Sequence, residues 1–187
     1  MGHPRYLLRE RKLETTGFVA PKPGLGHYAQ VYRDAAAQLA GTRTDGGPWA
    51  LPIIFLYRHA IEAIIKAILT EFGRDAGICP ECVLRRSHSL KQQLPDLQTV
   101  AKRSQVTLGP LFIQLIEAWE QDDAKGMKAR YPLTMGGQEQ ELPNSDAFDL
   151  RSLVDECESA LDELSELKAD LNFQRYSEIL KSEGLDF

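Results

Sequence analysis

Residues 49–72 read WALPIIFLYRHAIEAIIKAILTEF, and this stretch decides the fold. Placed on a helix of 3.6 residues per turn, its apolar side chains cover well over half of the circumference. A helix that is apolar over so much of its surface lies in the middle of its bundle. The pattern therefore predicts a central helix over residues 50–72. Pro52 falls in the first turn, where proline is tolerated, and Gly73 ends the helix.

Further helices are predicted where apolar side chains recur at spacings of three and four. The predicted segments are residues 26–40, 87–104, 108–123 and 148–171, with a short last helix at 174–181. Pro95 is expected to kink or split the second of them. No segment shows sustained strand alternation. The predicted fold class is all-α: an antiparallel bundle of four to five helices, with a long loop at residues 124–147 before the last long helix.

The domain organisation follows from the length of 187 residues, which suits a single domain. Residues 1–24 are punctuated by proline and glycine and are expected to form an extended lead. Residues 25–171 are expected to form the bundle, and residues 172–187 a short C-terminal helix and tail.

Composition excludes several classes of protein. The net charge of −5 argues against a general nucleic-acid coat, although the acids gather in residues 139–187 and the rest of the chain is mildly basic. No run of ~18 apolar residues occurs, so no membrane span is expected. The first residues lack the apolar core of a signal peptide, and three cysteines make no disulfide framework. We therefore expect a cytoplasmic protein.

Four ionisable residues interrupt the central helix and fall on one side of it: Arg58, His59, Glu62 and Lys66. Glu62 can pair with Arg58 and with Lys66, each at a spacing of four. One interpretation is a satisfied charge ladder that faces solvent. The other is a functional groove, in which Arg58 binds phosphate and His59 transfers a proton near neutral pH. The sequence leaves both interpretations open.

Three stretches carry a resemblance to a known family. Residues 49–69, with Arg58-His59-Ala60, then Glu62 and Lys66, resemble the central helix of HEPN-domain proteins. The stretch His88-Ser89-Leu90 and the stretch Arg130-Tyr131-Pro132 are also similar to that family. The resemblance covers roughly residues 26–170.

The resemblance implies a small helical bundle that forms a homodimer, with the active groove at the dimer interface. Many members are metal-independent endoribonucleases of prokaryotic defence or toxin–antitoxin systems; others bind RNA or nucleotides, or act as non-catalytic partners. Their catalytic signature is an arginine followed, after four to six residues, by a histidine. This sequence lacks that signature, because no histidine follows Arg58 or Arg130 at the required distance. RNA or nucleotide is the expected ligand, a cognate antitoxin is a candidate partner, and cleavage stays open.

Candidate site residues follow from the chemistry of metal-free RNA cleavage, which needs a base for the 2′-hydroxyl and a cation for the developing phosphorane charge. Arg58 and His59 are the candidate catalytic pair, and His88 with Arg85 and Arg86 is a second source of both functions. The candidate RNA- or nucleotide-binding residues are Arg58, Glu62, Lys66, His88, Arg130 and Tyr131. Alternatively, His88 only helps to start the helix at Ser87, and Tyr131 only anchors its loop.

Cysteine spacing offers a separate candidate. Cys79 and Cys82 form half of a zinc site, and His88 is a potential third ligand. No second cysteine pair follows, and Cys157 lies on the apolar seam of the last long helix, where an inert core thiol is expected. No cofactor is expected, with structural zinc kept as the weaker alternative.

A non-catalytic function is the other candidate for the whole chain. An adaptor or immunity protein would act through protein–protein contacts, with the acidic helix at residues 148–171 as its working surface. Both functions predict an oligomer, because the central helix is apolar over more of its circumference than one bundle needs.

Overall fold

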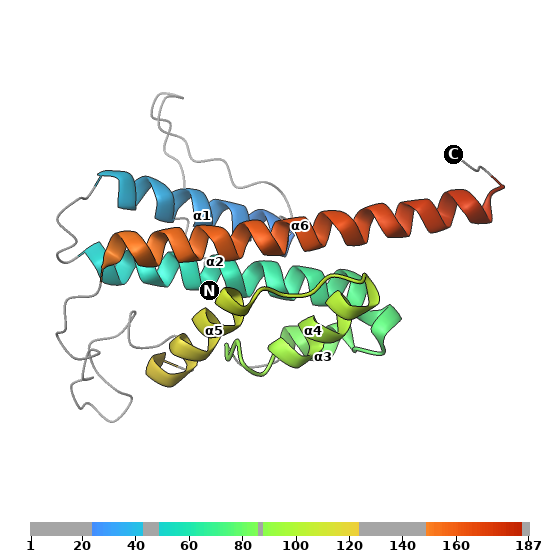
Figure 1. The fold of residues 1–187 in the computed structure, drawn as a ribbon, viewed down its shortest axis with the longest axis horizontal. Coiled ribbons are helices and arrows are strands. Elements are labelled where there is room, and N and C mark those ends of the chain that lie inside the picture. The colour runs from blue at the N-terminus through green and yellow to red at the C-terminus, as the bar shows by residue number, and fades with distance from the viewer. Residues whose placement is uncertain (1–23, 43–48, 86–87, 124–148, 185–187) are drawn as a thin grey trace, which may run out of the picture.

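The computed structural model describes residues 24–42, 49–85, 88–123 and 149–184. Every regular element in these ranges is helical, which confirms the all-α fold class (Figure 1). The elements are α1 (Leu25–Thr42), α2 (Ala50–Phe72), the 3-10 helix η3 (Gly73–Ala76), α3 (Pro80–Arg85), α4 (Leu94–Arg103), α5 (Pro110–Asp123) and α6 (Leu150–Ser182). Within the same ranges, no helix has both the length and the apolar character that crossing a bilayer requires.

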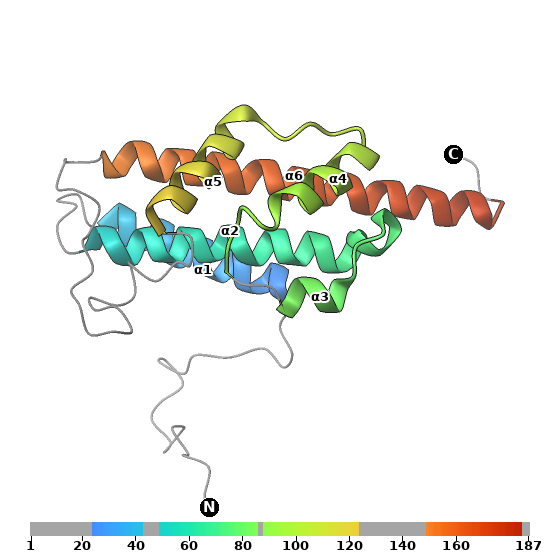
Figure 2. The ribbon, with the colours of Figure 1, turned by 90° about the horizontal axis from the view of Figure 1, so that it is seen from below.

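The three long helices α1, α2 and α6 lie side by side. Helices α4 and α5 pack on the side away from α1, α4 mainly against α2 and α5 mainly against α6 (Figures 1 and 2). Helix α1 is antiparallel to α2, as predicted. Helix α6 runs in the same direction as α2, because Tyr57 contacts Glu158 near one end and Glu71 contacts Lys168 near the other. The bundle is therefore antiparallel only in part.

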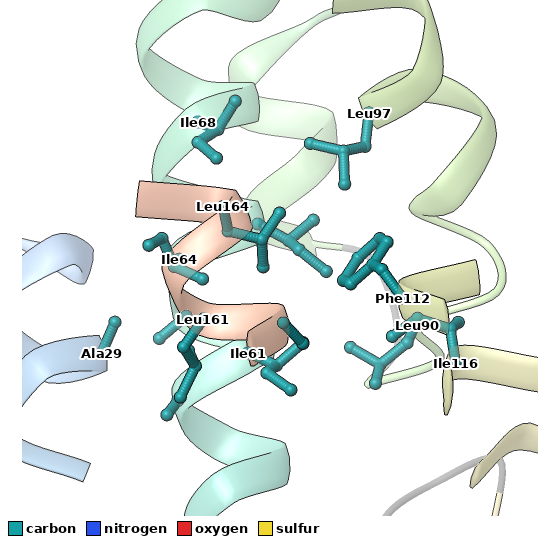
Figure 3. Packing of buried hydrophobic residues seen from close by; sticks show 14 of the residues in the cluster. Ala29, Ile61, Ile64, Ile68, Leu90, Leu97, Phe112, Ile116, Leu161 and Leu164 are labelled. Atoms are coloured by element: carbon teal, nitrogen blue, oxygen red, sulfur yellow. The ribbon is translucent and has the colours of Figure 1, made fainter. Parts of the chain in front are cut away.

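Helix α2 is the central helix, as its apolar circumference predicts. It supplies Ile61, Ile64 and Ile68 to a core that α6 completes with Leu161 and Leu164 (Figure 3). On the opposite side, buried apolar side chains come from the 88–93 turns, α4 and α5: Leu90, Leu97, Phe112 and Ile116. The core thus packs around the middle of α2, and a polar group buried there must find a partner inside the bundle.

The segment between α2 and α5 differs from the prediction. A helix was expected over residues 87–104, but α4 begins at Leu94. Pro95 occupies the first turn of α4, where proline is favoured, so it starts the helix instead of kinking it. Residues 88–93 form turns across α2, and α3 lies between the predicted helices at 50–72 and 87–104, where the pattern predicts no helix.

Helix α6 also differs from the prediction, because it continues to Ser182 without the break expected near residue 172. No proline or glycine stands between the two predicted helices to end the first one. Beyond the predicted break, Gln174 donates to the Ser104 carbonyl and Arg175 to the Glu71 carbonyl. These bonds hold residues 174–175 against the bundle. The separate C-terminal helix was therefore wrong.

A hydrogen-bonded cluster joins the three long helices. Arg33 of α1 donates to Glu158 at 2.7 Å and to Asp162 at 2.6 Å, both on α6. The Tyr57 hydroxyl of α2 donates to the other oxygen of Glu158 at 2.7 Å. Burial would lower the pKa of Arg33, but the hydrogen bonds to Asp162 and Glu158 outweigh it and raise that pKa. The guanidinium therefore stays charged.

We expect the free energy of unfolding to fall at alkaline pH. Burial, and then the Glu158 carboxylate, raise the pKa of Tyr57 far above its ordinary 10.0. Burial, and then nearby carboxylates, raise the pKa of the Cys157 thiol far above its ordinary 9.0. The folded state keeps these protons while the unfolded state releases them. The stabilisation is thus complete below pH 9.0 and is lost progressively as the pH rises further.

Urea denaturation between about pH 8 and about pH 10.5 measures this loss. Tyr57→Phe removes one of the two groups and should make the decline shallower. The matched control is Tyr176→Phe, because the Tyr176 side chain is exposed on α6. A Tyr57→Phe slope equal to that of the wild type would contradict the assignment.

Candidate functional site

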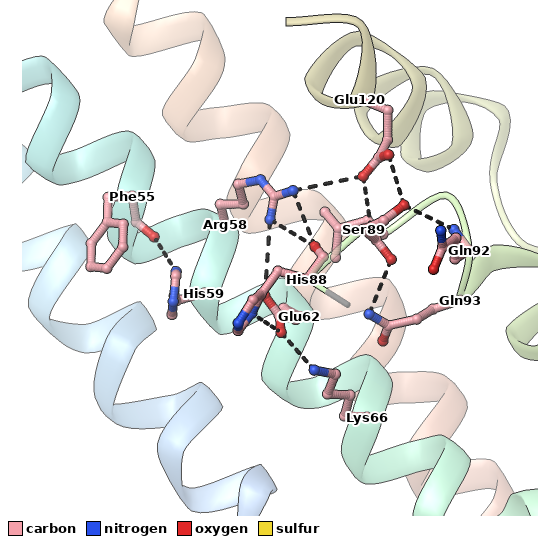
Figure 4. Close-up of polar contacts among 11 residues, drawn as sticks. Phe55, Arg58, His59, Glu62, Lys66, His88, Ser89, Gln92, Gln93 and Glu120 are labelled. Carbon is pink, nitrogen blue, oxygen red and sulfur yellow. Dashed lines mark hydrogen bonds and ion pairs between the residues drawn. The ribbon is translucent and has the colours of Figure 1, made fainter. Parts of the chain in front are cut away.

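The polar stripe of α2 lies inside the protein. Arg58 is 3% exposed, Glu62 5% and Lys66 8%, whereas His59 is half-buried. The interpretation of these residues as a charge ladder that faces solvent is therefore wrong. Turns at residues 88–93 and helix α5 provide partners for the stripe (Figure 4).

Glu62 is the centre of this network (Figure 4). Its Oε1 accepts a hydrogen bond from Lys66 Nζ at 2.8 Å and lies 2.8 Å from His88 Nδ1. Its Oε2 lies 3.9 Å from Arg58 Nη1. The predicted pairs at a spacing of four are thus both present, and His88 is an additional partner that comes from a different segment.

Arg58 holds the backbone of the neighbouring turn. Its Nη1 and Nη2 donate to the His88 carbonyl at 3.3 and 3.2 Å, and Nη2 lies 3.6 Å from Glu120 Oε1. This guanidinium is directed into the protein and satisfies protein acceptors. Arg58 therefore positions His88, and its burial does not suit the predicted role as a phosphate ligand.

Glu120 of α5 is a site residue that sequence reasoning missed. One carboxylate oxygen accepts from the Ser89 hydroxyl at 2.8 Å, and the other from the Leu90 amide at 2.7 Å. The signal in the sequence was weak: Glu120 stands one turn after buried Ile116, at the edge of the apolar stripe. Together with Arg58, Glu120 fixes the segment that carries His88.

His88 is the exposed member of the network, with a side chain 53% accessible. It does not begin a helix, because residues 88–93 form turns and α4 begins only at Leu94, so the helix-start interpretation is wrong. The centres of the His88 and His59 rings lie 6.4 Å apart, and the two ring planes are inclined by 28°. The fold therefore brings two imidazoles together from α2 and from the 88–93 turns.

The same ring nitrogen is held in both histidines. His59 Nδ1 lies 3.2 Å from the Phe55 carbonyl, and His88 Nδ1 lies against the Glu62 carboxylate. A carbonyl and an ionised carboxylate only accept, so Nδ1 carries the proton in each pairing. Nε2 is then the basic atom of each neutral ring.

The two cysteines of the candidate zinc site form a disulfide, Cys79–Cys82, at the start of α3. His88, the third candidate ligand, is engaged with Glu62. In the part of the chain that the structure describes, no group of three or more histidine, cysteine or acidic side chains is placed to hold a metal ion. Cys157 is fully buried, which confirms its place in the core.

The remaining predicted residues are not part of the network that the structure describes. Arg130 and Tyr131 lie outside the described residues, and so does Arg86. Arg85 is exposed at the C-terminal end of α3. The structure thus brings together Arg58, His59, Glu62, Lys66 and His88, and it adds Glu120.

An imidazole whose Nδ1 is held can act as a base through Nε2 and, once protonated, as an acid. Around the two rings, the positive charges of Arg58 and Lys66 balance the negative charges of two glutamates, Glu62 and Glu120. A protonated histidine therefore gives the cluster a net positive charge. Such a site suits an anionic substrate that requires both an acid and a base.

A comparison of the chain with protein-family models, curated proteins and solved structures found no match.

Proposed function

We propose that this helical protein binds RNA and cleaves it without a metal ion, with His59 and His88 as the acid–base pair. The observation that carries the proposal is the placement of the two rings 6.4 Å apart, with the exposed ring of His88 fixed on buried Glu62. Positioned imidazoles are effective general acids and bases near pH 7. The resemblance of residues 49–69 to the HEPN central helix supports the same substrate class.

The reaction is an internal transfer at the phosphorus atom. One imidazole takes the proton of the ribose 2′-hydroxyl, whose oxygen attacks the adjacent phosphorus. The other imidazole, in its protonated form, supplies the positive charge beside the phosphorane and gives a proton to the departing 5′-oxygen. The products are a 2′,3′-cyclic phosphate and a 5′-hydroxyl end, so no water or metal enters this step. The role of Arg58, Glu62 and Glu120 is to hold His88 in place.

The test is incubation of metal-stripped protein with a mixed tRNA and mRNA pool in the presence of a chelator. Wild-type protein should produce fragments that end in 2′,3′-cyclic phosphate. The variant His59→Ala/His88→Ala, purified identically, should be slower by at least about 10²-fold, since each acid or base contributes ~10²–10⁴. An all-deoxy copy of the substrate should stay intact because it lacks the nucleophile. Intact RNA with wild-type protein would exclude cleavage. A native gel shift with the same RNA measures binding.

A protein partner is the second candidate, and the end of α6 favours it. Phe173, Tyr176 and Ile179 are exposed large apolar side chains, and this end of α6 extends past the other helices (Figures 1 and 2). Exposed apolar groups of this size often mark protein contacts. In this alternative the protein is an adaptor or immunity protein, or a homodimer that pairs with an antitoxin in a prokaryotic defence system. Intact RNA together with a concentration-dependent increase in mass would support it.

A further inference from the structure

A row of aromatic rings leads across the surface to the histidine pair. Along α1, the rings of His27 and Tyr28 lie 6.4 Å apart between centres, and those of Tyr28 and Tyr32 lie 6.5 Å apart. The ring of Tyr32 lies 5.6 Å from His59 on α2, and His59 is followed by His88. The row therefore connects α1, α2 and the turn that carries His88.

Helix geometry explains the row. Tyr28 and Tyr32 are four residues apart and share one face of α1, and Tyr32 meets α2 at His59. The outer part of the row is open to solvent, because Tyr28 is 42% exposed and His27 is also exposed. Tyr32 packs partly against the core, which anchors the row. Core packing does not account for the exposed ring of Tyr28.

We propose that Tyr28 and Tyr32 form a base-stacking subsite that delivers single-stranded RNA to His59 and His88. The inference deepens the proposed cleavage function and rests on it. Unpaired bases stack readily on aromatic side chains, and the stacking tolerates any base because each has a π-face. The rings of Tyr28 and Tyr32 are near-parallel, with planes inclined by 29°, and their centres lie 6.5 Å apart, which exceeds the ~3.4 Å rise between stacked bases in a duplex. Successive bases reach successive rings only when the strand is unpaired and extended.

In this arrangement, RNA binding and RNA cleavage depend on different residues. Tyr28 and Tyr32 supply affinity through contacts that do not change during the reaction, whereas His59 and His88 act on the phosphate. Loss of a stacking ring should therefore raise the concentration of RNA needed for half-maximal cleavage. The rate at saturating RNA should stay the same, because the acid and base are untouched.

The test compares binding and cleavage of a labelled single-stranded RNA in four proteins: wild type, Tyr28→Ala, Tyr28→Phe and Tyr176→Ala. Tyr28→Ala should weaken binding by about 5- to 150-fold, the equivalent of one stacked base. Tyr28→Phe should bind like the wild type because it keeps the ring. Tyr176→Ala removes an exposed tyrosine of α6 and should change nothing. The same RNA annealed to its complement should bind equally to wild type and Tyr28→Ala.

The outcomes separate this inference from the proposed function. If the wild type neither binds nor cleaves RNA, both fail. If the wild type cleaves RNA and Tyr28→Ala binds single strands as tightly, only the stacking subsite fails. If Tyr28→Ala weakens duplex binding by the same factor, the ring is not a single-strand contact and the inference is also overturned. Thermal unfolding of each variant, expected to match the wild type, confirms that the exposed substitution leaves the fold intact.

Discussion

Glu62→Gln is expected to lower the free energy of unfolding by about 3–5 kcal/mol, the usual cost of removing one partner from a buried ion pair. Glutamine keeps the shape of the side chain but removes the charge that compensates Lys66, whose ammonium lies 2.8 Å away and is almost fully buried. The hydrogen bond with His88 Nδ1 is weakened at the same time. Urea denaturation followed by circular dichroism measures the change. A loss of this size is a large share of the ~5–15 kcal/mol that stabilises an ordinary domain.

A double-mutant cycle identifies the cause. Lys66→Met alone leaves Glu62 with one fewer partner, and Glu62→Gln/Lys66→Met removes both charges of the pair. The double variant should therefore lose less stability than the sum of the two single variants. Glu178→Gln on the exposed surface of α6 is the matched control and should stay within about 0.5 kcal/mol of the wild type. If Glu62→Gln behaves like this control, Glu62 is not the centre of a buried network.

The sequence predicts α2 well because the signals for this helix are local. Its apolar circumference, its early proline and the glycine that follows all lie within the helix or next to it. Elements that depend on distant contacts were predicted less well. Pro95 favours the first turn of α4, but the preceding turns are held by Arg58 and Glu120, and neither contact is visible in the local pattern. Helix α6 continues past residue 172 because of contacts with other parts of the bundle.

The candidate site, too, was predictable only where its signals are local in the sequence. The pattern on α2 placed Arg58, His59, Glu62 and Lys66 on one side of the helix. It could not show that the stripe is covered, because covering requires the 88–93 turns and α5 to pack there. The pairing of His59 with His88 joins residues 29 positions apart and follows only from the fold. Glu120 was missed because a lone glutamate on a helix is ordinarily solvated.

Glu120→Ala is expected to lower the free energy of unfolding by about 3 kcal/mol and to release the segment that carries His88. The substitution removes two hydrogen bonds to a charged acceptor, each worth roughly 1.5–3 kcal/mol in favourable cases. One of them satisfies the amide of Leu90, which is fully buried. The control is Glu117→Ala, one turn earlier on the exposed face of α5. Urea denaturation of the two variants gives the difference.

Amide hydrogen exchange distinguishes release of this segment from general destabilisation. If Glu120 clamps the segment, the Leu90 amide should exchange much faster in Glu120→Ala, beyond the change seen at the α4 amides of Val100 and Ala101. RNA cleavage by the folded variant should then fall in rate more than in affinity, since His88 loses its position while Tyr28 keeps its own. Uniform acceleration of exchange across α4 and residue 90 would mean that Glu120 stabilises the bundle without holding His88. That result would assign the positioning of the imidazole to Arg58 and Glu62, whose bonds reach His88 directly.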